Sequence, residues 1–94
     1  MPGTARRAAD AAVGAARADW ERGLAQEALG DIAVLQGDLA AAQQAFEAYL
    51  STYRRLVAAD PDQSWIRANL SVSLNRVGDV AVRRGDLAGA AAAY

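Results

Sequence analysis

Two stretches of this chain repeat each other at a fixed distance. The sequence "GDIAVLQGDLA" at residues 30–40 returns as "GDVAVRRGDLA" at residues 78–88, 48 positions later. When residues 30–46 are aligned with residues 78–94, ten of seventeen positions are identical without a gap, and glycine and aspartate recur in step. A fixed internal period of about 20–50 residues is typical of stacked repeat proteins. The chain is therefore expected to use one small structural unit twice.

Each copy has the pattern of a helix, a tight turn and a second helix. Gly37 can adopt the left-handed conformation that ends a helix, and the carboxylate of Asp38 can accept hydrogen bonds from the free amides of the next helix. This pair predicts a turn between two antiparallel helices, and Gly85-Asp86 predicts the same turn in the second copy. The second helix is expected over residues 39–59, because Pro61 disfavours helical backbone at the residue before it.

Apolar residues at helical spacing predict which faces of these helices are buried. On the helix before the first turn they are Trp20, Leu24, Ala28, Ile32 and Leu35. On the helix over residues 39–59 they are Ala42, Ala45, Phe46, Tyr49, Tyr53 and Leu56. On the helix over residues 65–84 they are Trp65, Leu70, Leu74, Val77, Ala81 and Val82. Gly30 and Gly78 lie inside helices, where glycine costs up to about 1 kcal/mol relative to alanine, so both predict a close approach of the partner helix.

The composition favours an all-α fold in which helices pack through small residues. Hydrophobic residues make up 53% of the 94 residues, and half of them are alanine. Alanine is the best helix former and contributes little buried area. The two prolines, Pro2 and Pro61, lie outside the expected helix interiors, and the alternating pattern of a β-strand is absent from the sequence.

Charge and residue usage argue against several functional classes. The net charge is −1 and every positive residue is an arginine, which is unlike the basic face of a nucleic-acid-binding domain or a polybasic membrane anchor. The chain has no cysteine, which excludes disulfides, thiolate nucleophiles and cysteine-based metal sites, and no histidine, the commonest general base and metal ligand. Asp31 and Asp79 recur and could share a proton or a cation in stacked repeats, but a surface role is favoured because no partner base or phosphate loop accompanies them. The sequence contains no run of 18 or more apolar residues, so no membrane span is predicted. A cytoplasmic protein is expected.

Small and apolar residues recur around the turn in both copies with one spacing. In the first copy they are Leu29-Gly30, Ala33, Gly37, Ala42 and Phe46. In the second copy they are Leu74, Val77-Gly78, Ala81, Gly85, Ala90 and Tyr94. This spacing resembles the motif of the tetratricopeptide repeat family. Gln26 stands where the motif opens with a large residue, and Arg54 stands at its closing proline. The period of 48 residues resembles the extended repeats of bacterial and kinesin-light-chain-like arrays.

This resemblance implies an all-α fold in which antiparallel helix-turn-helix repeats stack as an α-solenoid. It divides the chain into an N-terminal helix over residues 1–18, a first hairpin over residues 19–62 and a second hairpin over residues 63–94 that is truncated in its second helix. The N-terminal helix is either a cap or the remnant of a preceding repeat. Because about three or more repeats are usual in stable arrays, the sequence is expected to be a fragment of a larger protein.

The resemblance also implies that the first helix of each repeat lines a groove that binds extended peptides. The residues carried to this groove are Glu27, Asp31 and Leu35 from the first copy and Asn75, Asp79 and Arg83 from the second, with Val34 and Val82 beside them. The alternative interpretation is that Arg76, Asp79 and Arg83 form surface ion pairs within one helix, which contribute a few tenths of a kcal/mol each.

The sequence thus predicts a non-catalytic protein–protein interaction module, a scaffold segment that binds a protein or peptide and needs no cofactor or metal. Neither a nucleic acid nor a membrane is expected as a partner. The alternative is a self-associating helical unit that completes its core by homodimerisation. A catalytic domain would require residue types that this stretch lacks.

Overall fold

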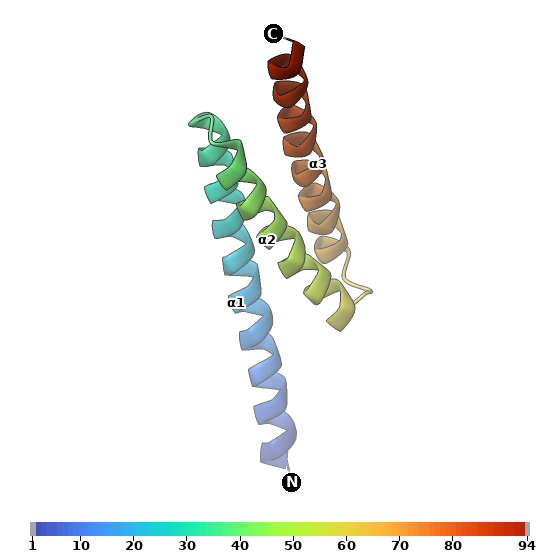
Figure 1. Cartoon of the computed structure of the whole chain (residues 1–94). Helices are drawn as coiled ribbons and strands as arrows, with labels where there is room; N and C mark the ends of the chain where they lie inside the picture. The colour runs from blue at the N-terminus through green and yellow to red at the C-terminus, as the bar shows by residue number, and fades with distance from the viewer. Residues whose placement is uncertain (1, 94) are drawn as a thin grey trace.

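The chain forms three helices arranged side by side (Figure 1). The structure, a computed structural model, describes the backbone of residues 2–93 and the side chains of Arg7, Gly14 and residues 17–88. All regular structure within residues 2–93 is helical: α1 (Pro2–Leu35), α2 (Leu39–Ala59) and α3 (Ser64–Ala93). The predicted all-α class is therefore confirmed. The molecule is elongated, with extents of 70 × 23 × 15 Å, because α2 packs against both neighbours while the ends of α1 and α3 project in opposite directions (Figure 1).

The predicted turn at Gly37-Asp38 is confirmed. Gly37 has a φ of +75°, and its amide donates to the carbonyl of Val34 at 3.0 Å. The amide of Asp38 donates to the carbonyl of Ala33 at 2.9 Å, so the last carbonyls of α1 are satisfied as in a Schellman motif. The carboxylate of Asp38 then accepts a hydrogen bond from the amide of Ala41 at 3.0 Å and caps α2.

The predicted turn at Gly85-Asp86 is wrong in this structure, because α3 runs through both residues to Ala93. Among the described residues, Gly37 alone has a positive φ. The two copies differ in the apolar content of the segment after the glycine and aspartate. The first pair precedes a helix with several large apolar side chains, whereas residues 87–93 hold Leu87 and otherwise alanine and glycine. Folding back would bury little area there, and alanine continues a helix at the lowest free-energy cost.

The expected boundary between residues 18 and 19 also shows no break. α1 is one continuous helix from Pro2 to Leu35, so the segment over residues 1–18 joins the first helix of the first hairpin within the part that is described. The boundary between residues 62 and 63 falls in the loop between α2 and α3. Contacts between α2 and α3 bridge this boundary, so the two segments pack together rather than separately.

α2 supplies most of the core. One buried cluster joins Phe46 and Ala42 of α2 with Ala33 of α1 and Val80 of α3. A second cluster contains Tyr49, Tyr53, Leu56 and Ile66. The predicted buried face of α2 is confirmed at Ala42, Phe46, Tyr49, Tyr53 and Leu56, whereas Ala45 is half-buried. Leu50 and Thr52 are also buried.

The predicted buried face of α1 is wrong. Trp20, Leu24, Ala28, Ile32 and Leu35 are all exposed. The face that packs against α2 instead carries small residues, Gly23, Gly30 and Ala33, and a Cβ atom built on Gly23 would lie 2.8 Å from Cε2 of Tyr53. The rings of α2 fill the space that side chains on α1 would need, so this helix buries its smallest residues and leaves its largest outside.

The two interior glycines have different surroundings. A Cβ atom on Gly30 would overlap the ring of Phe46, which confirms the predicted close approach. A Cβ atom on Gly78 would meet nothing within 4 Å, so the same prediction is wrong for the second copy. The predicted face of α3 is wrong for Trp65, Leu74, Ala81 and Val82, which are exposed. α3 packs on α2 through Ile66, Ser73 and Val80, with Leu70 and Val77 half-buried beside them.

Candidate functional site

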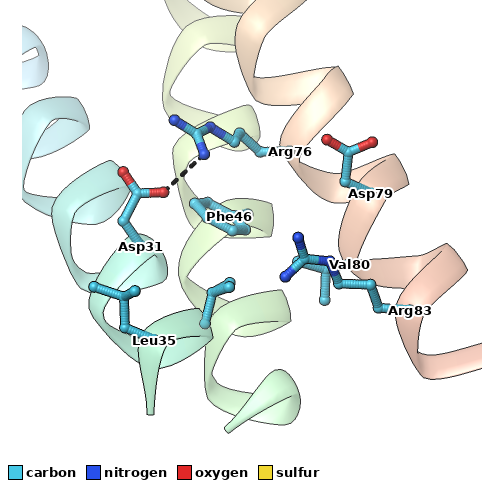
Figure 2. A pocket seen from close by; sticks show the side chains of 8 residues that line it. Asp31, Leu35, Phe46, Arg76, Asp79, Val80 and Arg83 are labelled. Carbon is cyan, nitrogen blue, oxygen red and sulfur yellow. Dashed lines mark ion pairs between the residues drawn. The ribbon is translucent and has the colours of Figure 1, made fainter. Parts of the chain in front are cut away.

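A hollow of about 300 Å³ lies between α1 and α3 (Figure 2). Phe46 of α2 forms its floor, and residues of the two outer helices form its walls. The lining residues are Asp31, Val34 and Leu35 of α1, Phe46 of α2, and Arg76, Asp79, Val80 and Arg83 of α3. Apolar surface thus lies at the bottom and charged groups lie around the rim.

The repeat explains why residues of α1 and α3 line the same hollow. Asp31 and Asp79 are 48 positions apart, as are Leu35 and Arg83. Residues with the same place in the repeat point in similar directions when both helices pack on α2, so both pairs lie on the same side of the three helices and line one hollow together. At the second pair, the apolar side chain of Leu35 on α1 corresponds to the basic side chain of Arg83 on α3.

One ion pair bridges the hollow. Nη1 of Arg76 lies 2.9 Å from Oδ1 of Asp31, and both side chains are partly exposed. The guanidinium carbon of Arg76 lies 5.7 Å from the centroid of the Phe46 ring, within the range of a cation–π contact. Arg76 therefore pairs with another helix, and not within α3 as the surface-pair interpretation required.

The other two charged side chains of the hollow lie on α3. Asp79 and Arg83 are both exposed. Neither has an ion-pair partner within 4.0 Å among residues 17–88. These two side chains project from α3 beside the apolar floor (Figure 2). They present one negative and one positive group at the same wall.

Four of the six predicted groove residues line this hollow: Asp31, Leu35, Asp79 and Arg83. Glu27 and Asn75 do not line it, and neither does Val82, whereas Val34 does. Sequence reasoning missed three lining residues, which are Phe46, Arg76 and Val80. The sequence pattern had placed Phe46 in the core alone. Arg76 could have been predicted as a lining residue, because its helical spacing puts it on the same face as Asp79 and Arg83.

Glu27 acts on the buried tyrosines of α2. Burial raises the pKa of Tyr49 and of Tyr53 above the ordinary value of a phenol, and the negative charge of Glu27 acts in the same direction. The hydroxyl of Tyr49 donates to Oδ1 of Asn69 at 3.0 Å. This bond joins α2 to α3 and satisfies the hydroxyl within the core.

Ionisation of these tyrosines is expected to lower the stability of the fold at alkaline pH. Their pKa values are higher in the folded chain than in the unfolded chain, so the stabilisation is complete below about pH 10 and is lost as pH rises toward the folded values. We expect the urea midpoint to be steady between about pH 8 and pH 9.5 and to fall above about pH 10. In Tyr49→Phe the fall should be shallower, after a loss at neutral pH of about 1 kcal/mol for the missing hydrogen bond. Equal slopes for both proteins would contradict this origin.

A second hollow lies on the opposite side of α1. It is lined by Gln26, Leu29, Ile32, Ala33, Gln36, Ala41, Gln44, Ala45 and Ala48. None of these residues is charged. Leu29 is 61% exposed at its edge, which makes it a useful counterpart to Leu35 on the first hollow.

The described residues contain no group of three or more acidic side chains close enough to hold a metal ion. Within the same residues, no helix combines the length and the apolar character that crossing a membrane requires. Comparison with protein-family models, with curated proteins and with solved structures finds no match to this chain. Functional interpretation therefore depends on the hollow and on the repeat.

Proposed function

We propose that this chain is a non-catalytic protein-interaction module that binds an extended peptide between α1 and α3. The observation that carries the proposal is the hollow over Phe46, which combines an apolar floor with the exposed charged side chains of Asp79 and Arg83. A tetratricopeptide-like arrangement within a cytoplasmic scaffold is part of the same proposal. It is supported by the 48-residue repeat and by the position of the hollow between the first helices of both copies.

The lining residues define the ligand that would fit. Val34, Phe46 and Val80 offer apolar surface for one or two side chains of the ligand. Asp79 and Arg83 favour charges of both signs beside that apolar residue, which suits an extended peptide of mixed charge. A carboxylate on the ligand would also compete with Asp31 for Arg76. The ion pair between Asp31 and Arg76 is half-exposed, and such pairs are weak.

Two leucines of α1 provide a matched test of this site. Leu35 is 87% exposed and lines the proposed groove, whereas Leu29 is 61% exposed and lines the opposite hollow. A displayed library of random peptides is selected against the full chain, and the affinity of each enriched synthetic peptide is measured by fluorescence anisotropy. We expect Leu35→Asp to weaken binding at least about tenfold, which corresponds to about 1.4 kcal/mol, and Leu29→Asp to leave it unchanged.

A charge substitution gives a second, independent test. Arg83→Glu should weaken the same peptides, whereas Arg67→Glu, at an exposed position outside the hollow, should have little effect. Circular dichroism checks that each variant keeps its helix content. The proposal is wrong if no peptide is enriched over an unrelated protein, or if the substitutions outside the hollow weaken binding as much as those within it.

A further inference from the structure

The second hollow, between α1 and α2, places exposed apolar side chains beside a groove of small residues. On α1 it is lined by Leu29 and Ile32, which are 61% and 50% exposed. On α2 it is lined by Ala41, Ala45 and Ala48, which are half-buried. Two large apolar side chains and the alanine-lined groove therefore belong to one continuous surface.

The second copy of the repeat shows that this face of the helix can pack against another helix. Ile32 corresponds to Val80, 48 positions later, which is 2% exposed and lies in the buried cluster with Phe46 of α2. Leu29 corresponds to Val77, which is half-buried against the same cluster. The same helix face is thus buried on α3, whereas its apolar side chains are exposed on α1.

The straight course of α1 explains this difference. α3 follows the loop at residues 60–63, where the chain turns back after α2. The equivalent residues before α1 are 12–15, and they lie inside the continuous helix Pro2–Leu35. Within residues 2–93 no helix therefore turns back onto this face of α1. Stacking of the repeats does not cover it, and its cover has to be sought outside the described chain.

We propose that a second copy of this chain covers the second hollow, in a dimer with two-fold symmetry. In such a dimer both copies use the same surface, so any charged group at the interface meets the same charge on the partner. None of the nine residues that line the second hollow is charged, whereas four of the eight that line the first hollow are charged. The second hollow can therefore meet a copy of itself without repulsion between like charges.

The shape of the surface fits the same arrangement. Leu29 and Ile32 of each copy enter the alanine-lined groove of the other, so each copy supplies both the inserted side chains and the groove that receives them. The dimer interface shares no lining residue with the peptide groove. Peptide binding and dimerisation are therefore separate properties of the chain.

Three glutamines supply the polar contacts of this interface. Gln26, Gln36 and Gln44 line the second hollow. A glutamine amide has both donors and an acceptor, so it can pair with another glutamine, which a carboxylate or a guanidinium cannot do with its own kind. Oε1 of Gln26 accepts a hydrogen bond from Oγ1 of Thr52 at 2.9 Å, which holds this side chain in place at the hollow.

Sedimentation equilibrium at a series of chain concentrations tests the proposal. We expect the mass to rise with concentration from the 9.8 kDa of one chain toward twice that value. Leu29→Asp should raise the dissociation constant of the dimer at least about tenfold, because it brings two carboxylates into an uncharged interface. Leu74→Asp is the matched control and should leave the constant unchanged, since Leu74 is a 47% exposed leucine of α3 that lines neither hollow.

Two results of this experiment would overturn the proposal. One is the mass of a single chain at every concentration. The other is an equal effect of Leu29→Asp and Leu74→Asp, which would place the contact on another surface. Circular dichroism checks that both variants keep their helix content. The peptide affinity of Leu29→Asp, measured separately, should stay unchanged, so a failure of dimerisation and a failure of peptide binding can be told apart.

Mixing variants of opposite charge tests the symmetry. Leu29→Glu and Leu29→Lys should each weaken the dimer when studied alone, because the same charge is then present twice at the interface. An equimolar mixture should associate more tightly than either variant, since opposite charges meet in the mixed dimer. If the mixture associates no more tightly than the separate variants, Leu29 contacts a different surface of its neighbour, and the two-fold arrangement is wrong.

Discussion

We expect Phe46→Ala to lower the free energy of unfolding by about 3–5 kcal/mol. Phe46 is 1% exposed and is the largest side chain in the cluster that joins all three helices. Its ring lies close against the backbone of Gly30, and the guanidinium group of Arg76 lies over the ring. Removing it leaves a cavity that the glycine cannot fill and deprives the arginine of its cation–π contact. Small domains have a total stability of about 5–15 kcal/mol, so this loss is a large share of the whole.

Urea unfolding followed by circular dichroism measures this effect. Because Phe46→Ala can unfold the chain outright, Phe46→Leu serves as a milder variant and should lose a smaller part of the stability. Leu35→Ala is the matched control, since Leu35 lines the same hollow but is 87% exposed. It should change the free energy of unfolding by less than about 0.5 kcal/mol. A similar loss in the control and in Phe46→Leu would show that the ring is not the centre of the core.

Gly30→Ala should destabilise the chain by about 1–2 kcal/mol, although alanine is the better helix former. Helix propensity alone would favour the substitution by up to about 1 kcal/mol. The new methyl group would overlap the ring of Phe46, and overpacking of this kind costs about 1–3 kcal/mol. Phe46 lies in a buried cluster with Ala33, Ala42 and Val80, so its ring cannot move away without disturbing these neighbours.

A double-mutant cycle isolates this contact. In the Phe46→Leu background Gly30→Ala should be neutral or stabilising, because the smaller side chain leaves room for the methyl group. The cycle is measured by urea unfolding of the wild type, the two single variants and the double variant. If Gly30→Ala destabilises equally in both backgrounds, the glycine is required for another reason and the close approach does not explain it.

The sequence was sufficient to predict features that depend on local chemistry. Gly37 and Asp38 predicted their own turn, because a left-handed glycine and a capping carboxylate act within a few residues of the chain. The buried face of α2 was also predictable. Its large apolar residues follow one helical stripe, and each finds a neighbouring helix on one side or the other.

The buried face of α1 was not predictable from its own apolar residues. That helix packs through Gly23, Gly30 and Ala33, because α2 fills the interface with its rings. Which of two partners contributes the volume is a property of the pair and does not appear in the pattern of either helix alone. The turn at Gly85-Asp86 failed for a related reason, since its residues match the first turn but the segment described after it has little apolar area to bury.

Four groove residues could be predicted because positions 48 apart line the same hollow. The other lining residues depend on how the helices pack. Arg76 has no equivalent charge in the first copy, where Ala28 occupies its place. Its ion pair with Asp31 joins the first helices of successive copies. Such a contact depends on the spacing between α1 and α3, which the repeat pattern alone does not state.

The position of α2 between two first helices has a consequence for how such a chain can change in evolution. The contacts of α2 depend on the spacing of residues along each helix: the backbone of Gly30 faces the ring of Phe46, and Val80 packs in the same buried cluster. A change of length inside a helix between Gly30 and Val80 therefore rotates one of these residues away from the ring, because each added residue turns a helix by about 100°. Such changes are expected to be tolerated in the loops at residues 36–38 and 60–63, where no helix is interrupted.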